Sequence, residues 1–149
     1  MRRLAFVLFT FLGTAALAAD GAVTGEDALF RDGTDLTLEE FQWVKRPVVV
    51  FADSPNDPRF KQQMDLLEAD TASLETRDVI VLTDTDPSAD SALREKLRPR
   101  GFMMVLVGKD GVVYLRKPQP WNVRELTRSI DKLPLRQQEE RDRRADPIR

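Results

Sequence analysis

Two patterns of apolar residues alternate along the centre of the chain. Residues 47–51 (Pro-Val-Val-Val-Phe) and 78–82 (Asp-Val-Ile-Val-Leu) are almost continuous runs of β-branched and aromatic residues. Such runs predict strands that are buried on both faces of a sheet. Between them, apolar residues recur at helical spacing and predict one helix with a single buried stripe, formed by Phe60, Met64, Leu67 and Leu74.

The same two patterns continue in the second half of the chain. Pro87 and Ser88 introduce a second helix, and residues 102–107 form the third predicted strand. Residues 108–111 (Gly-Lys-Asp-Gly) predict a hairpin turn into a fourth strand at residues 112–116, because an Asp-Gly pair between apolar runs is a strong hairpin signal. A last helix follows, with a predicted buried stripe of Val123, Leu126, Ile130 and Leu133.

Three segments have the sequence of a helix N-terminus. Thr37 and Glu40 form a capping box, which predicts a short leading helix before the first strand. Asp57 is the predicted cap of the long helix, which opens with proline at its favoured first position. Asn122 is the predicted cap of the last helix.

These elements follow the order βαβαββα after a short leading helix. That order predicts an α/β protein of the thioredoxin-like class, with a four-stranded mixed sheet and helices on both faces. We expect the two helical crossovers to make the first three strands parallel and the final hairpin to add an antiparallel edge strand. A flavodoxin-like sheet is the alternative, but it requires a helix where only the turn at residues 108–111 stands.

The first 18 residues have the three parts of a secretory signal peptide. A basic start at residues 1–3 precedes an uncharged apolar run over residues 4–17, and Ala16 and Ala18 are small residues at the positions that a signal peptidase reads. We expect cleavage after Ala18, or alternatively after Ala19, and a periplasmic or secreted protein. An uncleaved anchor is disfavoured because a spanning helix needs about 20 apolar residues.

The rest of the chain divides into three predicted parts. Residues 19–35 contain scattered glycines and acids and predict a flexible leader, with one short ordered piece at residues 28–30. Residues 36–134 form the thioredoxin-like domain. Residues 135–149 are rich in Arg, Gln and Glu and predict a solvated, charged tail or a frayed helix.

Composition excludes several classes of function. The chain has no cysteine and no histidine, so thiol–disulfide exchange, peroxidase chemistry at a thiol and a Ser–His–Asp nucleophile are all ruled out. Removing Arg2 and Arg3 with the signal peptide lowers the 23 basic residues to 21 against 25 acidic ones, which moves the net charge from −2 to −4. A mildly acidic chain is a poor binder of nucleic acid.

Four short blocks of sequence resemble the family known as domain of unknown function 4174. The blocks are Trp43-x-x-Arg46-Pro47 with the strand that follows, Asp57-Pro58-Arg59-Phe60, residues 105–111, and residues 135–139. The resemblance covers roughly residues 36–139. It implies a peroxiredoxin-like fold and an exported bacterial protein, and it supplies no catalytic residues.

The loop before the long helix is the first candidate binding site. Asp53, Ser54, Asp57 and Arg59 stand there, at the place where this fold usually presents its reactive thiol. Free amides and the positive end of a helix dipole would favour an anion or a partner's carboxylate, with Arg59 as the fork. The alternative is that Asp57 only caps the helix and Arg59 is solvated. Asp53 and Asp57 themselves argue against an anion and offer oxygen ligands to a cation.

Three further features carry weaker expectations. Residues 84–90 contain three acids that could hold a hard cation, although the spacing is not that of an EF-hand and helix capping explains most of the run. Gly101 stands where thioredoxin-like proteins usually have a cis-proline, which puts thioredoxin-like peptide binding in doubt. We expect Trp43 to lie in the core and Trp121 to form a hydrophobic staple with Leu126.

Three classes of function follow from these features. We favour a non-catalytic binding module of the cell envelope, whose partner is another envelope protein or a small ligand. The alternatives are an enzyme that uses carboxylates or a bound cation in the same loop, and a structural or assembly protein that docks through its charged tail. The sequence indicates no cofactor and leaves the oligomeric state open.

Overall fold

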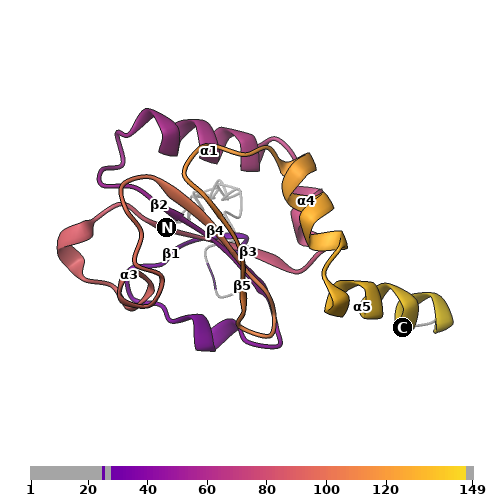
Figure 1. Cartoon of the computed structure of the whole chain (residues 1–149). Helices are drawn as coiled ribbons and strands as arrows, with labels where there is room; N and C mark the ends of the chain where they lie inside the picture. The colour runs from indigo at the N-terminus through magenta and orange to yellow at the C-terminus, as the bar shows by residue number, and fades with distance from the viewer. Residues whose placement is uncertain (1–24, 26–27, 147–149) are drawn as a thin grey trace, which may run out of the picture.

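A mixed sheet of five strands forms the centre of the protein, and helices cover both of its faces (Figure 1). The computed structural model describes residue 25 and residues 28–146, so the predicted signal peptide lies outside the described residues. The strands lie in the order β1-β3-β2-β4-β5, and their bounds are β1 (Phe30–Asp32), β2 (Arg46–Phe51), β3 (Val79–Asp84), β4 (Met103–Val107) and β5 (Val113–Lys117). The predicted α/β class, with a mixed sheet and helices on both faces, is confirmed.

The helices are η1 (Leu38–Phe41), α1 (Pro58–Glu68), α2 (Thr71–Glu75), η2 (Pro87–Ala89), α3 (Ala92–Leu97), α4 (Val123–Asp131) and α5 (Pro134–Ala145). The helix starts predicted at Thr37, Asp57 and Asn122 are confirmed, whereas the helix expected from Pro87 is divided at the left-handed Asp90 into η2 and α3. The single long helix expected from Phe60 to Leu74 is in fact two helices. The chain breaks at Asp70, because the Asp70 side chain accepts a hydrogen bond from the Ser73 amide and caps a new helix.

Strand alternation divides the core into two layers. Successive residues of the central strands point to opposite faces of the sheet. On one face Val48 and Val50 pack with α1, α2 and α4, whereas Val49 and Phe51 pack with η1 and α3 on the other. Both layers are essentially closed to solvent, which explains why β2 and β3 appear in the sequence as continuous apolar runs.

The fifth strand comes from the segment expected to be a flexible leader. β1 pairs in parallel with β3, and hydrogen bonds from the Val81 amide to the Leu29 carbonyl and from the Gly33 amide to the Thr83 carbonyl close the pairing at 2.7 and 2.8 Å. The ordered piece expected at residues 28–30 is therefore part of an edge strand. The predicted four-stranded sheet has five strands, since β3 offers an open edge that β1 covers.

The third predicted strand runs in the opposite direction to the one expected. β2 and β3 are parallel, but β4 pairs antiparallel with β2, with Val48 opposite Leu106. The physical reason is the length of α3, whose six residues span only about 9 Å, whereas β3 spans about 20 Å. The chain therefore does not return to the far end of the sheet before β4 begins.

Trp43 is exposed, and the expectation that it lies in the core is wrong. Its side chain keeps 65% of its surface in solvent, and its backbone has φ of 66°, a left-handed conformation that is unusual for a bulky residue. The turn between η1 and β2 fixes this geometry, because the Trp43 amide donates to the Lys109 carbonyl at 2.7 Å. Trp121 is partly buried against the core, as a staple residue would be.

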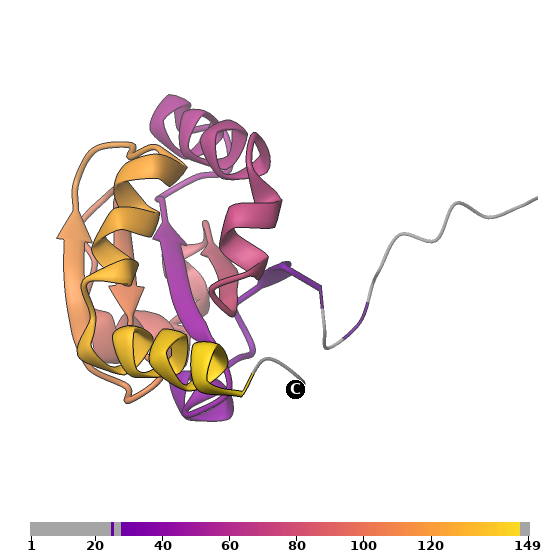
Figure 2. The ribbon, with the colours of Figure 1, turned by 90° about the vertical axis from the view of Figure 1, so that its right-hand side faces the viewer.

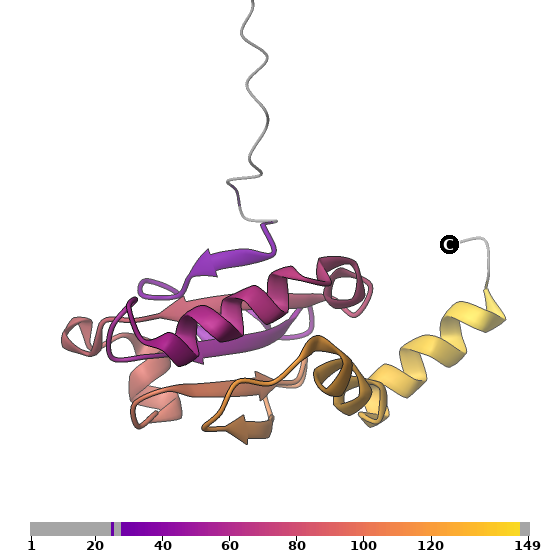
Figure 3. The same cartoon turned by 90° about the horizontal axis from the view of Figure 1, so that it is seen from above.

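The charged C-terminal segment is a helix that projects from the body of the protein (Figure 3), on the side that faces the viewer in Figure 2. The expected helical form is confirmed up to Ala145, but the segment is not wholly solvated. Arg136, on its first turn, is buried with 4% of its surface exposed. Its ion-pair partners are acidic residues of α4 and α5, and they are described below.

Candidate functional site

The predicted binding loop joins the carboxyl end of β2 to the start of α1. Asp57 caps α1 as expected, since its carboxylate accepts the Arg59 amide at 2.9 Å, and Pro58 occupies the first turn. The Ser54 hydroxyl accepts the Asn56 amide at 3.1 Å and so folds the loop on itself. The free amides that would have favoured an anion are therefore partly used within the loop.

Arg59 is exposed, with 46% of its side chain in solvent, but its guanidinium is paired with its neighbours. Its guanidinium donates to Asp57 from Nη2 at 3.0 Å and from Nε at 3.3 Å. The same group lies 5.6 Å from the centre of the buried Phe102 ring, a cation–π arrangement. Hydrogen bonds from the Arg59 side chain and amide lower the pKa of Asp57, and that pairing raises the pKa of Arg59.

Asp53 is the loop residue with unused hydrogen-bonding capacity. Its exposed carboxylate forms no hydrogen bond or ion pair with any residue that the structure describes. Gly101 lies beside it, with φ of 60°, and a side chain at that position would begin 4.0 Å from Oδ2 of Asp53. Glycine there satisfies the left-handed backbone and keeps the space next to Asp53 open. The described chain contains no cis peptide bond, so Gly101 does not reproduce a cis-proline.

A buried polar cluster supports the loop from beneath. Arg94 donates from Nη2 to the Ala52 carbonyl at 2.7 Å and from Nε to Asp84 at 2.9 Å. Asp84 is fully buried and also accepts the Ser91 hydroxyl. The cluster ties the loop after β2 to the end of β3 and to α3. Sequence reasoning missed it, although an acid at the end of an apolar strand and an arginine on the next helix were the available signal.

Asp53, Ser54, Asp57 and Arg59 are thus brought together, as expected. With Asn56 and Pro58 they line an open hollow of about 500 Å³. Two carboxylates and one guanidinium give this hollow a net negative charge, which disfavours an anion. The loop presents the free carboxylate of Asp53 beside the paired Asp57 and Arg59, and it contains no thiol or histidine.

The acidic run at residues 84–90 does not form a cation site in the described chain. Asp84 is bonded to Arg94, and Asp86 caps η2 by accepting the Ser88 amide at 3.0 Å. Within residues 28–146, no three acidic side chains gather as metal ligands would. Asp86 is therefore a helix cap, as the simpler alternative proposed, and Asp84 is held by an ion pair.

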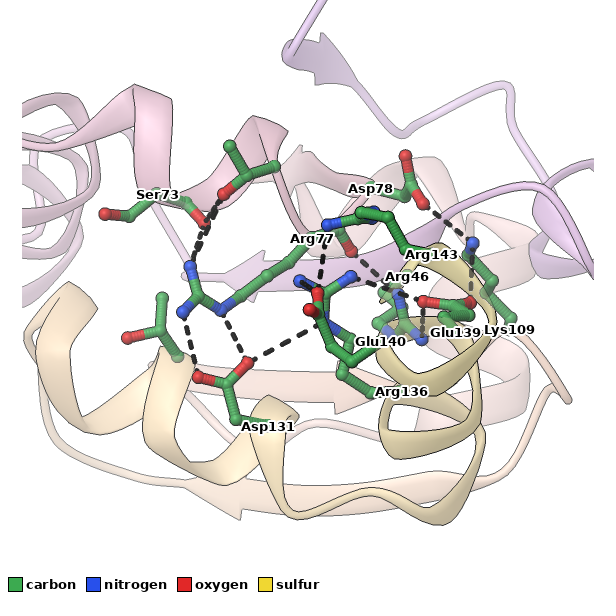
Figure 4. A network of polar contacts seen from close by, with 12 residues as sticks. Arg46, Ser73, Arg77, Asp78, Lys109, Asp131, Arg136, Glu139, Glu140 and Arg143 are labelled. Carbon is green, nitrogen blue, oxygen red and sulfur yellow. Dashed lines mark hydrogen bonds and ion pairs between the residues drawn. The ribbon is translucent and has the colours of Figure 1, made fainter. Parts of the chain in front are cut away.

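A second polar cluster lies at the other end of the sheet, where β2 and β3 begin (Figure 4). Arg46 is 1% exposed and donates to the Arg77 carbonyl at 2.8 Å and to Glu139 of α5 at 3.0 Å. Lys109, from the hairpin, bridges Asp78 and Glu139 at 2.8 Å each. Burial alone would raise the pKa of Glu139, but hydrogen bonds from Lys109 and Arg46 outweigh it and lower that pKa.

The same cluster continues along α5 toward the ends of α2 and α4. Arg77 forms two bonds of 2.8 Å with the carboxylate of Asp131, and these bonds lower the pKa of Asp131. Arg136 donates to Glu140 at 2.5 Å. Sequence reasoning placed Arg136 and Glu140 in a solvated tail. It missed the Arg77–Asp131 pair, because an ion pair between residues 54 positions apart has no local signature.

Comparison with known proteins agrees with this architecture. The family described as domain of unknown function (DUF4174) matches residues 37–139. Plasmodium yoelii Prx1a, modified at its N-terminus, is 17% identical, with a TM-score of 0.50 over 68% of this chain and 79% of its own. The reduced 2-Cys peroxiredoxin of Plasmodium vivax is 13% identical, with a TM-score of 0.52 over 69% of this chain and 84% of its own.

These two structures show a shared thioredoxin-like fold. Comparison with curated protein sequences gives no match. Among the described residues, no helix combines the length and apolar character that crossing a bilayer requires.

Proposed function

This chain belongs to the DUF4174 family, and from that premise we propose that it is a non-catalytic binding module on a thioredoxin-like scaffold. The loop of Asp53, Ser54, Asp57 and Arg59 is its proposed recognition surface. The observation that carries the proposal is that Arg94, Asp57 and Phe102 hold the loop in place although it offers no thiol and no histidine.

The Plasmodium vivax structure is a 2-Cys peroxiredoxin, and its likeness to this chain is one of fold. Thiol chemistry requires a cysteine thiolate. This chain has none, so it retains the fold without the reactive group. Function follows the site and not the fold, and this site is a set of fixed polar groups.

The chemistry of the loop favours a partner that donates hydrogen bonds. Asp53 is exposed, unpaired among the described residues and open on the side of Gly101. Asp57 and Arg59 neutralise one another, so Asp53 sets the local charge. We therefore propose a polypeptide segment with a basic side chain or free amide donors as the ligand.

An enzyme that uses the same carboxylates is less well supported. General acid–base catalysis needs a group free to exchange a proton with the substrate. Asp57 is occupied by the α1 amide and by Arg59, which leaves Asp53 alone. The proposal therefore assigns recognition, and not turnover, to this loop.

We also propose that the protein acts outside the cytoplasm after removal of residues 1–18. The support is the basic, apolar and small-residue pattern of the N-terminus. Mass spectrometry of the protein from its source cells tests this. We expect Ala19 as the first residue, and a chain that retains Met1 would contradict the proposal.

Partner capture with two charge-neutral double variants tests the recognition surface. Asp57→Asn with Arg59→Gln keeps a capping side chain but removes the ion pair on the loop. Lys61→Gln with Asp65→Asn makes the same change at two exposed positions further along α1. We expect a binding partner from envelope extracts to remain bound to the second variant and to be lost from the first.

Asp53→Asn, made as a third and single variant, tests the free carboxylate on its own. This variant removes the free charge without touching the cap or the ion pair, and we expect the affinity of the purified partner to fall at least tenfold by calorimetry. If every captured partner binds all three variants as tightly as the unaltered protein, the recognition surface lies elsewhere.

A further inference from the structure

A second cleft, at the opposite end of the sheet from the recognition loop, lies between α5 and the ends of α2 and α4. Its volume is about 480 Å³, within the range of small-ligand sites. We call it the arginine cleft. Six charged side chains line it: Arg77, Asp131, Arg136, Glu140, Arg141 and Arg144.

The arginine cleft is positive in a protein that is negative overall. Four arginines face two carboxylates there, whereas the whole chain has a formal net charge of −2. On α5, Arg141 and Arg144 lie one turn apart, and Arg136 lies on the first turn of the same helix. Guanidinium groups that lie this close together repel one another, so negative groups are needed to stabilise them.

The two carboxylates do not satisfy all of the arginine donors. Both oxygens of Asp131 are held by Arg77 at 2.8 Å, and Oε1 of Glu140 is shared between Arg136 and Arg143. Arg144 forms no hydrogen bond or ion pair with the described residues. The guanidinium groups therefore have donors to spare.

The Nε–H group of Arg136 is the clearest sign of a missing acceptor. The Arg136 side chain is 5% exposed, and its Nε is buried without a hydrogen-bond partner. Oδ1 of Asp131 lies 3.7 Å from this Nε, which is too long for a hydrogen bond. A buried donor without an acceptor is costly, so an acceptor that reaches this cluster stabilises it.

From these observations we propose that the arginine cleft binds a small oxyanion with at least two negative charges. Guanidinium groups bind carboxylate and phosphate oxygens in pairs, and two charges match the net charge of the cleft. When the oxyanion takes donors of Arg77, Asp131 is released to close the 3.7 Å gap to Nε of Arg136. Arg141 and Arg144 hold the outer side of the ligand.

Titration of the purified protein with inorganic phosphate and with citrate tests this, at an ionic strength held constant with NaCl. We expect at least one of the two anions to raise the unfolding temperature in a saturable manner. Phosphate alone identifies a phosphate ligand and citrate alone a polycarboxylate, whereas both together identify a general oxyanion site. If neither exceeds the effect of NaCl, the proposal is overturned.

Matched variants distinguish the cleft from general attraction by positive charge. Arg141→Gln with Arg144→Gln removes two cleft arginines, and Arg124→Gln with Arg128→Gln removes two exposed arginines of α4 outside it. We expect the first pair to weaken anion binding at least tenfold and the second to change it less than twofold. Equal weakening by both pairs would overturn the proposal.

A nuclear magnetic resonance titration of the unaltered protein gives a measurement that does not depend on variants. We expect the Nε–H signal of Arg136 to shift as Asp131 moves within hydrogen-bonding distance, and an unchanged signal at saturating anion would contradict this. The Asp57→Asn, Arg59→Gln variant should bind the anion normally, because its changes lie at the other end of β2. The two proposals can therefore fail separately.

Discussion

Arg46 and Glu139 are 93 positions apart in the chain, yet their side chains meet at 3.0 Å. Arg46 opens the central strand β2, and Glu139 lies on the last helix. α5 has few apolar residues with which to pack, so this pair and the Lys109 bridge to Glu139 attach the helix to the body. The consequence is a helix whose position depends on charge.

Removing the Glu139 carboxylate should be costly. In Glu139→Gln the 1%-exposed Arg46 loses its counter-charge, and we expect a loss of about 2 kcal/mol in the free energy of unfolding, measured by urea denaturation. Glu75→Gln is the control, since Glu75 is exposed and has no ion pair in the described chain, and it should change stability by less than about 0.5 kcal/mol. Equal effects of the two variants would show that the buried pair contributes nothing.

Acid should weaken the attachment of α5. The pKa of Glu139 is lowered below its ordinary value of 4.5, because the bonds from Lys109 and Arg46 outweigh desolvation. A lowered pKa means that its stabilisation is complete above about pH 4.5 and is lost as the pH falls through the folded-state value. We expect the stability difference between the unaltered protein and Glu139→Gln to be constant from pH 6 down to about pH 4.5 and to shrink as the pH is lowered further. A difference that stays constant below pH 4.5 until the protein unfolds would contradict this.

The cap of α1 can be tested apart from the ion pair beside it. Asp57→Ala removes the acceptor of the Arg59 amide and should lower the free energy of unfolding by about 1 kcal/mol. Asp57→Asn retains a capping oxygen and should lose less than half of that. Urea denaturation measures both, and equal losses would mean that charge, not capping, is what Asp57 supplies.

Trp43 should tolerate glycine, unlike a core tryptophan. Its φ of 66° suits glycine, and 65% of its side chain is already in solvent. Relief of the left-handed backbone offsets the lost contacts and the greater freedom of the unfolded chain, so we expect Trp43→Gly to change stability by no more than about 1 kcal/mol. A buried tryptophan would lose about 3–5 kcal/mol on truncation, and a loss of that size would contradict the exposed position.

The parts of the fold that local chemistry determines could be predicted from the sequence. The apolar runs of β2 and β3, the Asp-Gly hairpin before β5 and the caps at Asp57 and Asn122 all lie where expected. In each case the signal and the structure involve neighbouring residues. The loop from Asp53 to Arg59 was found in the same way, through its place before a capped helix.

The parts that depend on distant partners could not be predicted. Three residues of β1 are too few to show a pattern, and only the open edge of β3 makes them a strand. Arg46 looks like a solvated residue before a proline, and its burial depends on Glu139. The direction of β4 depends on how far a short helix carries the chain, which periodicity does not reveal.

The position of β1 also bears on where the domain can be cut. The family match begins at residue 37, downstream of the Phe30–Asp32 strand. A fragment trimmed to that boundary would leave one side of β3 with bare amides and carbonyls, ready to recruit another molecule's strand and seed aggregates. The smallest piece that stays monodisperse in solution must therefore start upstream of the stretch that relatives share.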